Sequence, residues 1–465
     1  MNFKKFNFEE QSQLKRVFLK YNENMPTDAE IKNIIKEKNI NSIYLQFSDI
    51  SGQVKNINLP AYEIDRILNN EISFDCSAVC GFRNNETEDL FCYPDKNTFL
   101  AFPFKFSKLQ NTARLICDIY KADGTPYPGC PRANLKRVIE NAKKYNYTMK
   151  IAPETEFFLF KVDENSNIIS TLKDSVGYYD LNSDENLEDV LASIVAAMAE
   201  MGWDINAVHH EGAPFQHEID LGYDDVLRSA DNFATFKFVV KAIALKYGLN
   251  ASFMPKPVYG INGSGLHLNL VLSQNGKNAF YDPAGTYQLS ETAQYVVGSL
   301  LKNVSGITAL LNPSVNSYKR LVKDYEAPIY IAWSVLNRGS LVRIPSNRDE
   351  DTKIELRSPD ASINPYFAFA AVLQTCMDGI RNKIDPPAPI EKDLFQLSNN
   401  EIKLRKIKSL PENLSDALDS FEKNLTAKAS LGEYIFNEFL TQKRAEWNMY
   451  RKQVTKWELE TYLDV

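Results

Sequence analysis

All four histidines of this chain lie between residues 209 and 267, close to glutamates, although the sequence runs to 465 residues. Three of them fall in the segment His209–Glu218, and the fourth, His267, ends the glycine-rich segment that begins at Asn262. Histidine is the commonest metal ligand and the side chain that most readily exchanges a proton near neutral pH. Because the chain has no histidine elsewhere, this clustering predicts a chemical role for the region.

Glutamates supply most of the metal-binding capacity around these histidines. Glu154 and Glu156 stand two residues apart before an aromatic run, and a strand would project both carboxylates from one face. Taken alone, this pair is more simply interpreted as two solvated glutamates on an exposed strand edge. The full set of candidate ligands is rich in oxygen: Glu154, Glu156, Glu211, Glu218, His267 and Glu355. Such a set suits Mg²⁺ or Mn²⁺ better than zinc, and it predicts two metal sites completed by water.

Arginines gather further along the chain, at Arg320, Arg338, Arg343 and Arg357. The guanidinium group pairs bidentately with phosphate and carboxylate oxygens. Divalent metals followed by arginines indicate phosphoryl transfer, in which catalysis consists mostly of positioning and charge neutralisation. Each arginine taken singly is also consistent with a surface ion pair. Glu326 lies in a loop among them, where it could close or polarise a site.

Composition and charge limit the classes of protein to which the chain can belong. Its length predicts about two domains, and 44% hydrophobic with 24% charged residues is typical of a soluble globular protein. The net charge of −7 argues against a nucleic-acid-binding surface. We expect no signal peptide and no membrane-spanning segment. The six cysteines lack the spacing of a zinc site and are expected to be reduced thiols, which predicts a cytoplasmic protein.

The pattern of turns and apolar residues predicts an α+β fold. Residues 1–27 form a charged extension, and Thr27 with Glu30 predicts a capping box at the start of a helix that stops near Lys38. A turn-rich segment, residues 123–131, predicts a domain boundary near residue 130. The other expected elements are a hairpin of residues 42–47 and 54–59, strands over 113–120 and 154–162, and helices over 132–145, 187–201, 236–247 and 431–457. Their irregular order favours α+β over a doubly wound sheet, and the sequence has neither a P-loop nor a dinucleotide fingerprint.

Short motifs in a characteristic order run along most of the chain. They are Phe74–Ser77, Pro153–Phe158, His209–Glu211, Gln216–Glu218, Met254–Pro257, Asn262–His267, Asn316–Leu321, Tyr325–Pro328, Asn337–Arg338, Arg343–Pro345 and Asn364–Tyr366. In this order they resemble class I glutamine synthetase, in the short variety of Gram-positive bacteria and some archaea. The resemblance implies a β-grasp domain over residues 28–130 and a catalytic domain over residues 131–465, with a curved antiparallel sheet flanked by helices.

The same resemblance implies an ATP-dependent ligase that makes L-glutamine from L-glutamate and ammonia through γ-glutamyl phosphate. It also implies Mg²⁺ or Mn²⁺ at a two-metal site between subunits, with twelve subunits arranged in two hexameric rings. Because the carboxylate of glutamate is a poor electrophile, ATP would convert it to an acyl phosphate while metals and arginines offset the charge. Ammonium must then lose a proton, and water must be kept from the intermediate.

The functional residues of the family correspond to definite positions of this sequence. One metal would be held by Glu156, Glu211 and Glu218 and the other by Glu154, His267 and Glu355, with His209, His210 and His217 framing Glu211 and Glu218. Glutamate would be bound by Asn262, Gly263, Arg320 and Arg357, phosphate by Arg338 and Arg343, and the nucleotide by Lys353. Glu326 would shield the intermediate, Asp75 would take a proton from ammonium in the neighbouring subunit's site, and Tyr178 would line the ammonium pocket.

The chain departs from the family pattern around the residues that handle ammonium. The family's Asp-Gly-Ser-Ser motif reads Asp-Cys-Ser-Ala over residues 75–78, and Cys80 and Asn84 replace a glutamate and a feedback-inhibition arginine. Phe395 takes the place of a tyrosine that some relatives adenylylate, so this control is not expected. Two alternatives therefore stay open: a γ-glutamyl ligase for an organic amine or polyamine, and a catalytically weakened regulatory homologue.

Overall fold

The computed structural model describes residues 25–82, 89–105, 110–163, 176–181 and 185–465. The chain forms two compact units, one of Met1–Arg137 with Lys150–Phe253 and the other of Val138–Met149 with Met254–Val465. Most of the N-terminal extension and Asn84 lie outside the described residues. The domain boundary near residue 130 remains a prediction.

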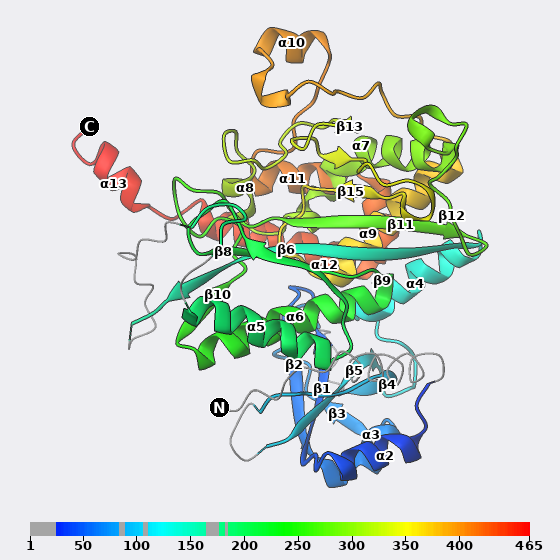
Figure 1. Ribbon diagram of the computed structural model, residues 1–465. Coiled ribbons are helices and arrows are strands. Elements are labelled where there is room, and N and C mark those ends of the chain that lie inside the picture. Colours follow the sequence, from blue (N-terminus) through cyan, green and yellow to red (C-terminus); the bar gives the residue numbers. More distant parts are fainter. Residues whose placement is uncertain (1–24, 83–88, 106–109, 164–175, 182–184) are drawn as a thin grey trace. The chain divides into compact units, whose positions relative to one another are not determined.

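The N-terminal part of the first unit is a five-stranded sheet with the strand order β2-β1-β5-β4-β3 (Figure 1). Its strands are β1 (Ser42–Ser48), β2 (Val54–Pro60), β3 (Ile72–Phe74), β4 (Leu90–Ala101) and β5 (Thr112–Tyr120), which confirms the predicted hairpin and the strand over 113–120. β1 and β5 run parallel, and the other neighbours are antiparallel. The helices of this part are α2 (Asp28–Glu37) and α3 (Ile64–Leu68), and α2 begins at the predicted capping box of Thr27 and Glu30.

The rest of the first unit combines antiparallel strands with two long helices. β6 (Tyr147–Lys161), which belongs to this unit from Lys150 on, pairs with β8 (Gln216–Leu221), and β8 pairs with β7 (Ile205–His210). β9 (Asp224–Asp225) and β10 (Leu249–Ser252) also pair with β6. The helices are α5 (Glu185–Glu200) and α6 (Val226–Lys246), and α6 packs against β10. α6 begins before the predicted residue 236 because the side chain of Asp225 accepts a hydrogen bond from the Leu227 N–H and caps the helix.

A buried ion cluster connects the two parts of the first unit. Arg132, near the start of α4 (Pro131–Lys143), is only 3% exposed. Its guanidinium contacts Asp231 of α6 at 2.9 Å, Asp118 of β5 at 3.2 Å and Asp95 of β4 at 2.8 Å. Lys136, one turn further along α4, contacts Asp118 at 2.5 Å from a half-exposed position. A buried charge is tolerated only when it is paired, and the guanidinium of Arg132 supplies the positive charge that these three carboxylates need.

The second unit combines short strands with a packed set of helices. Its strands are β11 (Leu266–Gln274), β12 (Lys277–Asn278), β13 (Trp333–Ser334), β14 (Val342–Arg343) and β15 (Ile354–Leu356). β15 lies between β11 and β14 and is antiparallel to both. Its helices are α7 (Glu291–Leu311), α8 (Ser317–Arg320), α9 (Pro365–Asn382), α10 (Asn399–Leu404), α11 (Leu414–Glu422), α12 (Leu425–Tyr450) and α13 (Lys456–Tyr462). α7, α9, α11 and α12 pack on one another (Figure 1).

The fold is α+β, as the sequence predicts. One expected helix, over residues 431–457, is wrong in its limits, because α12 ends at Tyr450 and a separate helix, α13, follows. Thr455 starts α13 with a capping box that includes Glu458, so the chain leaves one helix and begins another. In the part of the chain that the structure describes, no helix is both long enough and apolar enough to cross a membrane.

Candidate active site

Carboxylates from two neighbouring strands face each other in the first unit. The register of β6 and β8 pairs Glu156 with Glu218 and Glu154 with Asp220. Side chains at paired positions of antiparallel strands project from the same face, and positions two apart share that face. The strand register therefore places four acidic groups together on a single surface of the sheet.

The electrostatics of this surface favour a bound cation. Burial, together with the neighbouring carboxylates of Glu156 and Asp220, raises the pKa of Glu218 to about 12. One oxygen each from Glu154, Glu218 and Asp220 lies within 4.8 Å of the others. Adjacent carboxylates repel unless a proton or a cation compensates them, and carboxylate oxygen is the ligand that Mg²⁺ and Mn²⁺ prefer. These residues thus fit the divalent metal that the sequence predicts.

The histidine-rich segment adds a second group of ligand atoms in the same unit. His209 Nδ1 lies 3.7 Å from Glu211 Oε1, and ligand atoms of His209, Glu211 and Glu218 all lie within 4.8 Å of one another. Glu156 accepts a 2.9 Å hydrogen bond from the side-chain amide of Gln216, which holds that carboxylate in place. The sequence predicts only a framing role for His209, whereas the geometry also makes it a possible ligand.

The other two histidines of this segment occupy supporting positions. His210 Nδ1 lies 2.6 Å from the carbonyl oxygen of Glu211, and the ring of His210 meets the buried ring of His217 edge to face at 5.1 Å. These contacts are those expected of residues that frame Glu211. Tyr178 is half exposed, with its ring centroid 5.7 Å from that of His209, and burial raises its pKa, as do Tyr179 and Glu211. The ring of Tyr178 is therefore close to the predicted metal ligands.

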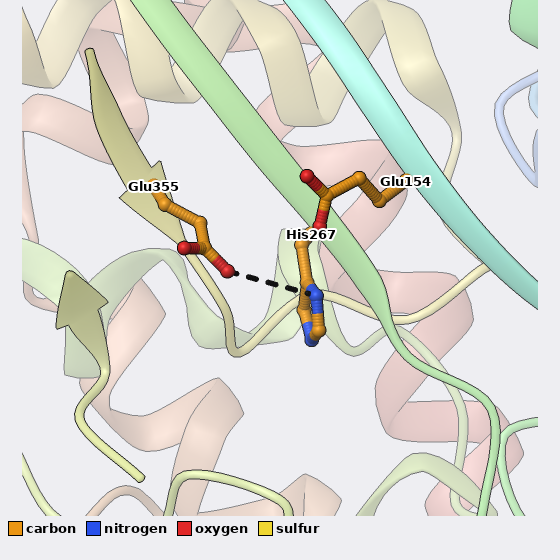
Figure 2. Close-up of side chains that lie close together, drawn as sticks. All are labelled: Glu154, His267 and Glu355. Atoms are coloured by element: carbon orange, nitrogen blue, oxygen red, sulfur yellow. Dashed lines mark ion pairs between the residues drawn. The ribbon is translucent and has the colours of Figure 1, made fainter. Parts of the chain in front are cut away.

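In the second unit, His267 and Glu355 form the predicted pair of ligands. His267 Nδ1 on β11 lies 3.7 Å from Glu355 Oε1 on β15 (Figure 2). Glu355 is nearly fully buried, and its two oxygens contact Arg343 at 2.8 Å and Arg357 at 3.1 Å. β14 places Arg343 directly opposite Glu355 in the strand register. The predicted phosphate- and substrate-binding arginines and the predicted ligand His267 therefore all contact the carboxylate of Glu355.

The predicted glutamate-binding residues also come together in the second unit. Arg320 is buried and donates from Nη1 to the carbonyl oxygen of Ser358 at 2.9 Å. A Cβ atom at Gly263 would lie 3.2 Å from Arg320 Cγ, so these two residues are in direct contact. Asn262 Nδ2 donates to Glu326 Oε2 at 3.2 Å. The residue predicted to shield the intermediate thus touches a residue predicted to bind the substrate.

Three further predicted residues lie in exposed or partly exposed positions. Arg338 is exposed between β13 and β14, and Lys353 is half-buried just before β15. Asp75 is exposed just after β3, and its carboxylate accepts a 2.8 Å hydrogen bond from the Ser77 N–H. This bond lowers the pKa of Asp75. Asp75 belongs to none of the metal-ligand groups formed by the residues in view.

Asp220 was not nominated from the sequence, although a signal for it exists. It stands two residues after Glu218, so the alternation of a strand puts both on one face. Glu154 and Glu156 are related by the same spacing. The spacing alone therefore predicts that Asp220 lies on the same face as Glu218. The pairing of Glu154 with Asp220 and of Glu156 with Glu218 depends on the register of β6 with β8, which the sequence does not state.

Comparison with known proteins yields two family models that together span most of the chain. The model for "Glutamine synthetase, beta-Grasp domain" matches residues 39–122, and that for "Glutamine synthetase, catalytic domain" matches residues 128–462. A glutamine synthetase of Staphylococcus epidermidis is 45% identical over 438 residues, covering 94% of this chain and 98% of the relative. One of Clostridium saccharobutylicum is 46% identical, with 94% of this chain and 99% of the relative covered. The predicted family and its β-grasp and catalytic domains are confirmed.

Solved structures agree with these relatives. The GmaS/ADP complex in its conformation 1 superposes with a TM-score of 0.85 at 33% identity, covering 93% of this chain and 99% of the other. The cryo-EM structure of Plasmodium falciparum glutamine synthetase gives a TM-score of 0.83 at 25% identity, covering 94% of this chain and 99% of the other. The similarity therefore extends over nearly the whole chain in three dimensions.

Proposed function

The chain belongs to the glutamine synthetase family of glutamine-forming ligases, and from this premise we propose that it joins L-glutamate to ammonia through γ-glutamyl phosphate at a two-metal site. The observation that carries the proposal is the facing arrangement of Glu154, Glu156, Glu218 and Asp220 on β6 and β8. A solvated surface would not crowd acidic groups so closely that burial and like charge raise the pKa of one of them to about 12.

The metal ligands in this proposal are those of the family. Glu156, Glu211 and Glu218 hold one Mg²⁺ or Mn²⁺, and Glu154, His267 and Glu355 hold the other. Divalent cations bound there would neutralise phosphate oxygens and polarise the transferring group. The crowding of Glu218 and the proximity of His267 to Glu355 support this division.

Arginines and the loop of Glu326 bind and protect the reacting groups. Arg320 and Arg357 hold the carboxylates of glutamate, and Arg343 with Arg338 meets the phosphate as it transfers. Glu326 covers the acyl phosphate, because water in the site would hydrolyse it before ammonia attacks. The contact of Glu326 with Asn262 supports this role, since it brings the covering residue to the substrate-binding segment.

Asp75 is the proton acceptor in the second half of the reaction. Ammonium must lose a proton before its nitrogen can attack, and an ionised carboxylate can take it. The exposure of Asp75 and the hydrogen bond that holds its carboxylate on the Ser77 N–H support this assignment, although the same bond lowers the pKa of Asp75 and makes it a weaker base. In the proposed dodecamer Asp75 serves the neighbouring subunit's site, near Tyr178.

A second candidate is a γ-glutamyl ligase whose acceptor is an organic amine. The observation that favours it is the change of the family's Gly-Ser-Ser to Cys76, Ser77 and Ala78 beside Asp75. The Cys76 side chain is buried beside the exposed Asp75, so the change lies within the segment that presents Asp75. Such a change bears on the acceptor and leaves the activation of glutamate untouched.

The decisive experiment measures ADP and amide product with glutamate, ATP and Mg²⁺, supplying ammonium or a panel of mono- and polyamines. We expect glutamine to form with ammonium. Product with an amine and none with ammonium would establish the second candidate, and no turnover with any acceptor would indicate a regulatory homologue. Glu154→Ala should abolish ADP release, whereas Asp75→Ala should retain ATP binding and lose ammonium-dependent synthesis. An unchanged Asp75→Ala enzyme would contradict the proton-acceptor role.

A further inference from the structure

The motif Met254–Pro257 contains a buried lysine that the proposed reaction does not use. Lys256 lies in the segment between β10 and β11 and is only 9% exposed. Its ammonium nitrogen sits 3.4 Å from the centroid of the Tyr325 ring and donates a hydrogen bond to the carbonyl oxygen of Ile261. Tyr325 precedes Glu326, and Ile261 precedes Asn262. One cation therefore contacts both the covering loop and the substrate-binding segment.

The loop of residues 322–328, which contains Glu326 and is called the covering loop here, has a strained backbone. Asp324 and Glu326 adopt φ angles of 79° and 60°, in the left-handed region that residues other than glycine rarely enter. The Ala327 N–H closes a tight turn onto the Tyr325 carbonyl oxygen at 2.7 Å. A strained exposed segment persists only when its surroundings hold it. The ring of Tyr325, placed on the Lys256 ammonium, is a contact that can hold it.

The position of Lys256 is itself fixed from the other side. Its backbone N–H donates to Asn316 Oδ1 at 2.7 Å, and the Asn316 side-chain amide donates back to the Lys256 carbonyl oxygen at 3.0 Å. Burial lowers the pKa of Lys256, as does the nearby charge of Arg320. A desolvated ammonium next to another cation gains from an aromatic face and a carbonyl oxygen. The Lys256 side chain is thus buried and held in place, unlike the lysines on the surface.

We propose that Lys256 is a positioning residue whose cation–π contact with Tyr325 holds the Glu326 loop over the Asn262–Gly263 segment. The proposal rests on the proposed function, because it gives the loop the task of keeping water from γ-glutamyl phosphate. In this role Lys256 acts through its contacts with Tyr325 and Ile261. Its loss should leave activation of glutamate largely intact and let water reach the intermediate.

The test compares ADP release with glutamine formation in the same reaction. A cation–π contact of ordinary strength changes the balance between a closed and an open loop by about two- to thirtyfold. Lys256→Met should therefore raise the ratio of ADP to glutamine severalfold, while Lys256→Arg, which retains a cation, should keep the ratio near that of the natural enzyme. Tyr325→Leu should raise the ratio, and Tyr325→Phe, which keeps the aromatic face, should not.

Two further measurements keep the outcome unambiguous. Because the two residues act as one contact, Lys256→Met combined with Tyr325→Leu should be no worse than either change alone. Hydrogen exchange of residues 322–328 should be faster in Lys256→Met than in the natural chain, even if the natural chain has no ligase activity. Absence of any glutamate-dependent ADP release would overturn the proposed function alone. A normal ADP-to-glutamine ratio, or unchanged exchange of the loop, in Lys256→Met would overturn the role of Lys256.

Discussion

Gly263 offers a direct test of the glutamate-binding segment, because its backbone lies against two groups at once. A Cβ atom placed there would lie 2.2 Å from the carbonyl oxygen of Pro255 and 3.2 Å from Arg320 Cγ. The Pro255 oxygen also accepts a 2.8 Å hydrogen bond from the Ser264 N–H, so it cannot turn away without losing a partner. Gly263→Ala should therefore displace the substrate-binding segment rather than a flexible side chain.

The size of the effect follows from that distance. To bring the new Cβ into ordinary contact with the Pro255 oxygen, the two backbone segments must separate by about 1 Å. A displacement of that size in a group that positions substrate costs about 100-fold in rate. We expect kcat/KM for glutamate to fall by about this factor in Gly263→Ala, with KM for ATP changed much less.

A matched substitution separates misplacement from simple instability. Gly298 lies in α7, and a Cβ there would meet the carbonyl oxygen of Ile384 at 2.1 Å, which is as severe a clash. Gly298→Ala should lower the free energy of unfolding by about 1–3 kcal/mol, as overpacking does, yet retain kcat/KM per folded molecule. Steady-state kinetics and thermal unfolding of both variants test this. Equal losses of kcat/KM in the two variants, or a Gly263→Ala enzyme with normal glutamate kinetics, would refute the reasoning.

Four other substitutions, one of them a control, test the ion cluster, the metal site and the acceptor step. Arg132→Met should lower the free energy of unfolding by about 3–5 kcal/mol, against at most about 1 kcal/mol for the half-exposed Lys136→Met; urea titration at fixed protein concentration measures both. Burial raises the pKa of Asp95, but Arg132 outweighs it and lowers the pKa overall. The difference in the free energy of unfolding between the natural chain and Arg132→Met should therefore be largest at neutral pH and should shrink as the pH falls through the lowered pKa. Glu156→Gln should raise the Mg²⁺ concentration needed for thermal stabilisation by at least about tenfold, and an unchanged titration would remove Glu156 from the ligands. Asp75→Asn should reduce ammonium-dependent synthesis less at alkaline pH, where free ammonia is present, as a pH series with ADP and glutamine readouts would reveal.

Much of the candidate site was predictable because residue type alone restricts its chemistry. His267 stands out because histidine is rare in the chain, and Glu154 and Glu156 stand out by the two-residue spacing of a strand, whereas the role of Glu355 follows from the family resemblance. The capping box at Thr27 likewise follows from local chemistry, and the structure confirms it. Predictions of this kind succeed because the deciding interaction lies within a few residues of the chain.

Other features depend on contacts between distant segments and were beyond reach. The pairing of Glu156 with Glu218 requires a register between β6 and β8, and shifting it by one residue would turn one set of side chains to the other face. The contact of Lys256 with Tyr325 joins positions with no sequence relation. The early start of α6 lies between these two cases. Asp225 is a residue type that caps helices, but it also belongs to the strand β9, and local rules do not decide which of the two structures it takes.

The two predicted metal sets differ in how the chain itself compensates their charge. Glu355 is buried between Arg343 and Arg357, so its negative charge is already balanced by cations of the protein. Glu218 is buried, with Glu156 opposite it on β6 and His209 opposite it on β7, and burial and the carboxylates of Glu156 and Asp220 raise its pKa. A bound divalent cation therefore relieves repulsion around Glu218, whereas around Glu355 it adds to positive charge already present. The carboxylates of β6 and β8 are therefore the part of the site that depends most on metal, and the arginine-bound carboxylate of Glu355 is the part that is ordered by the fold.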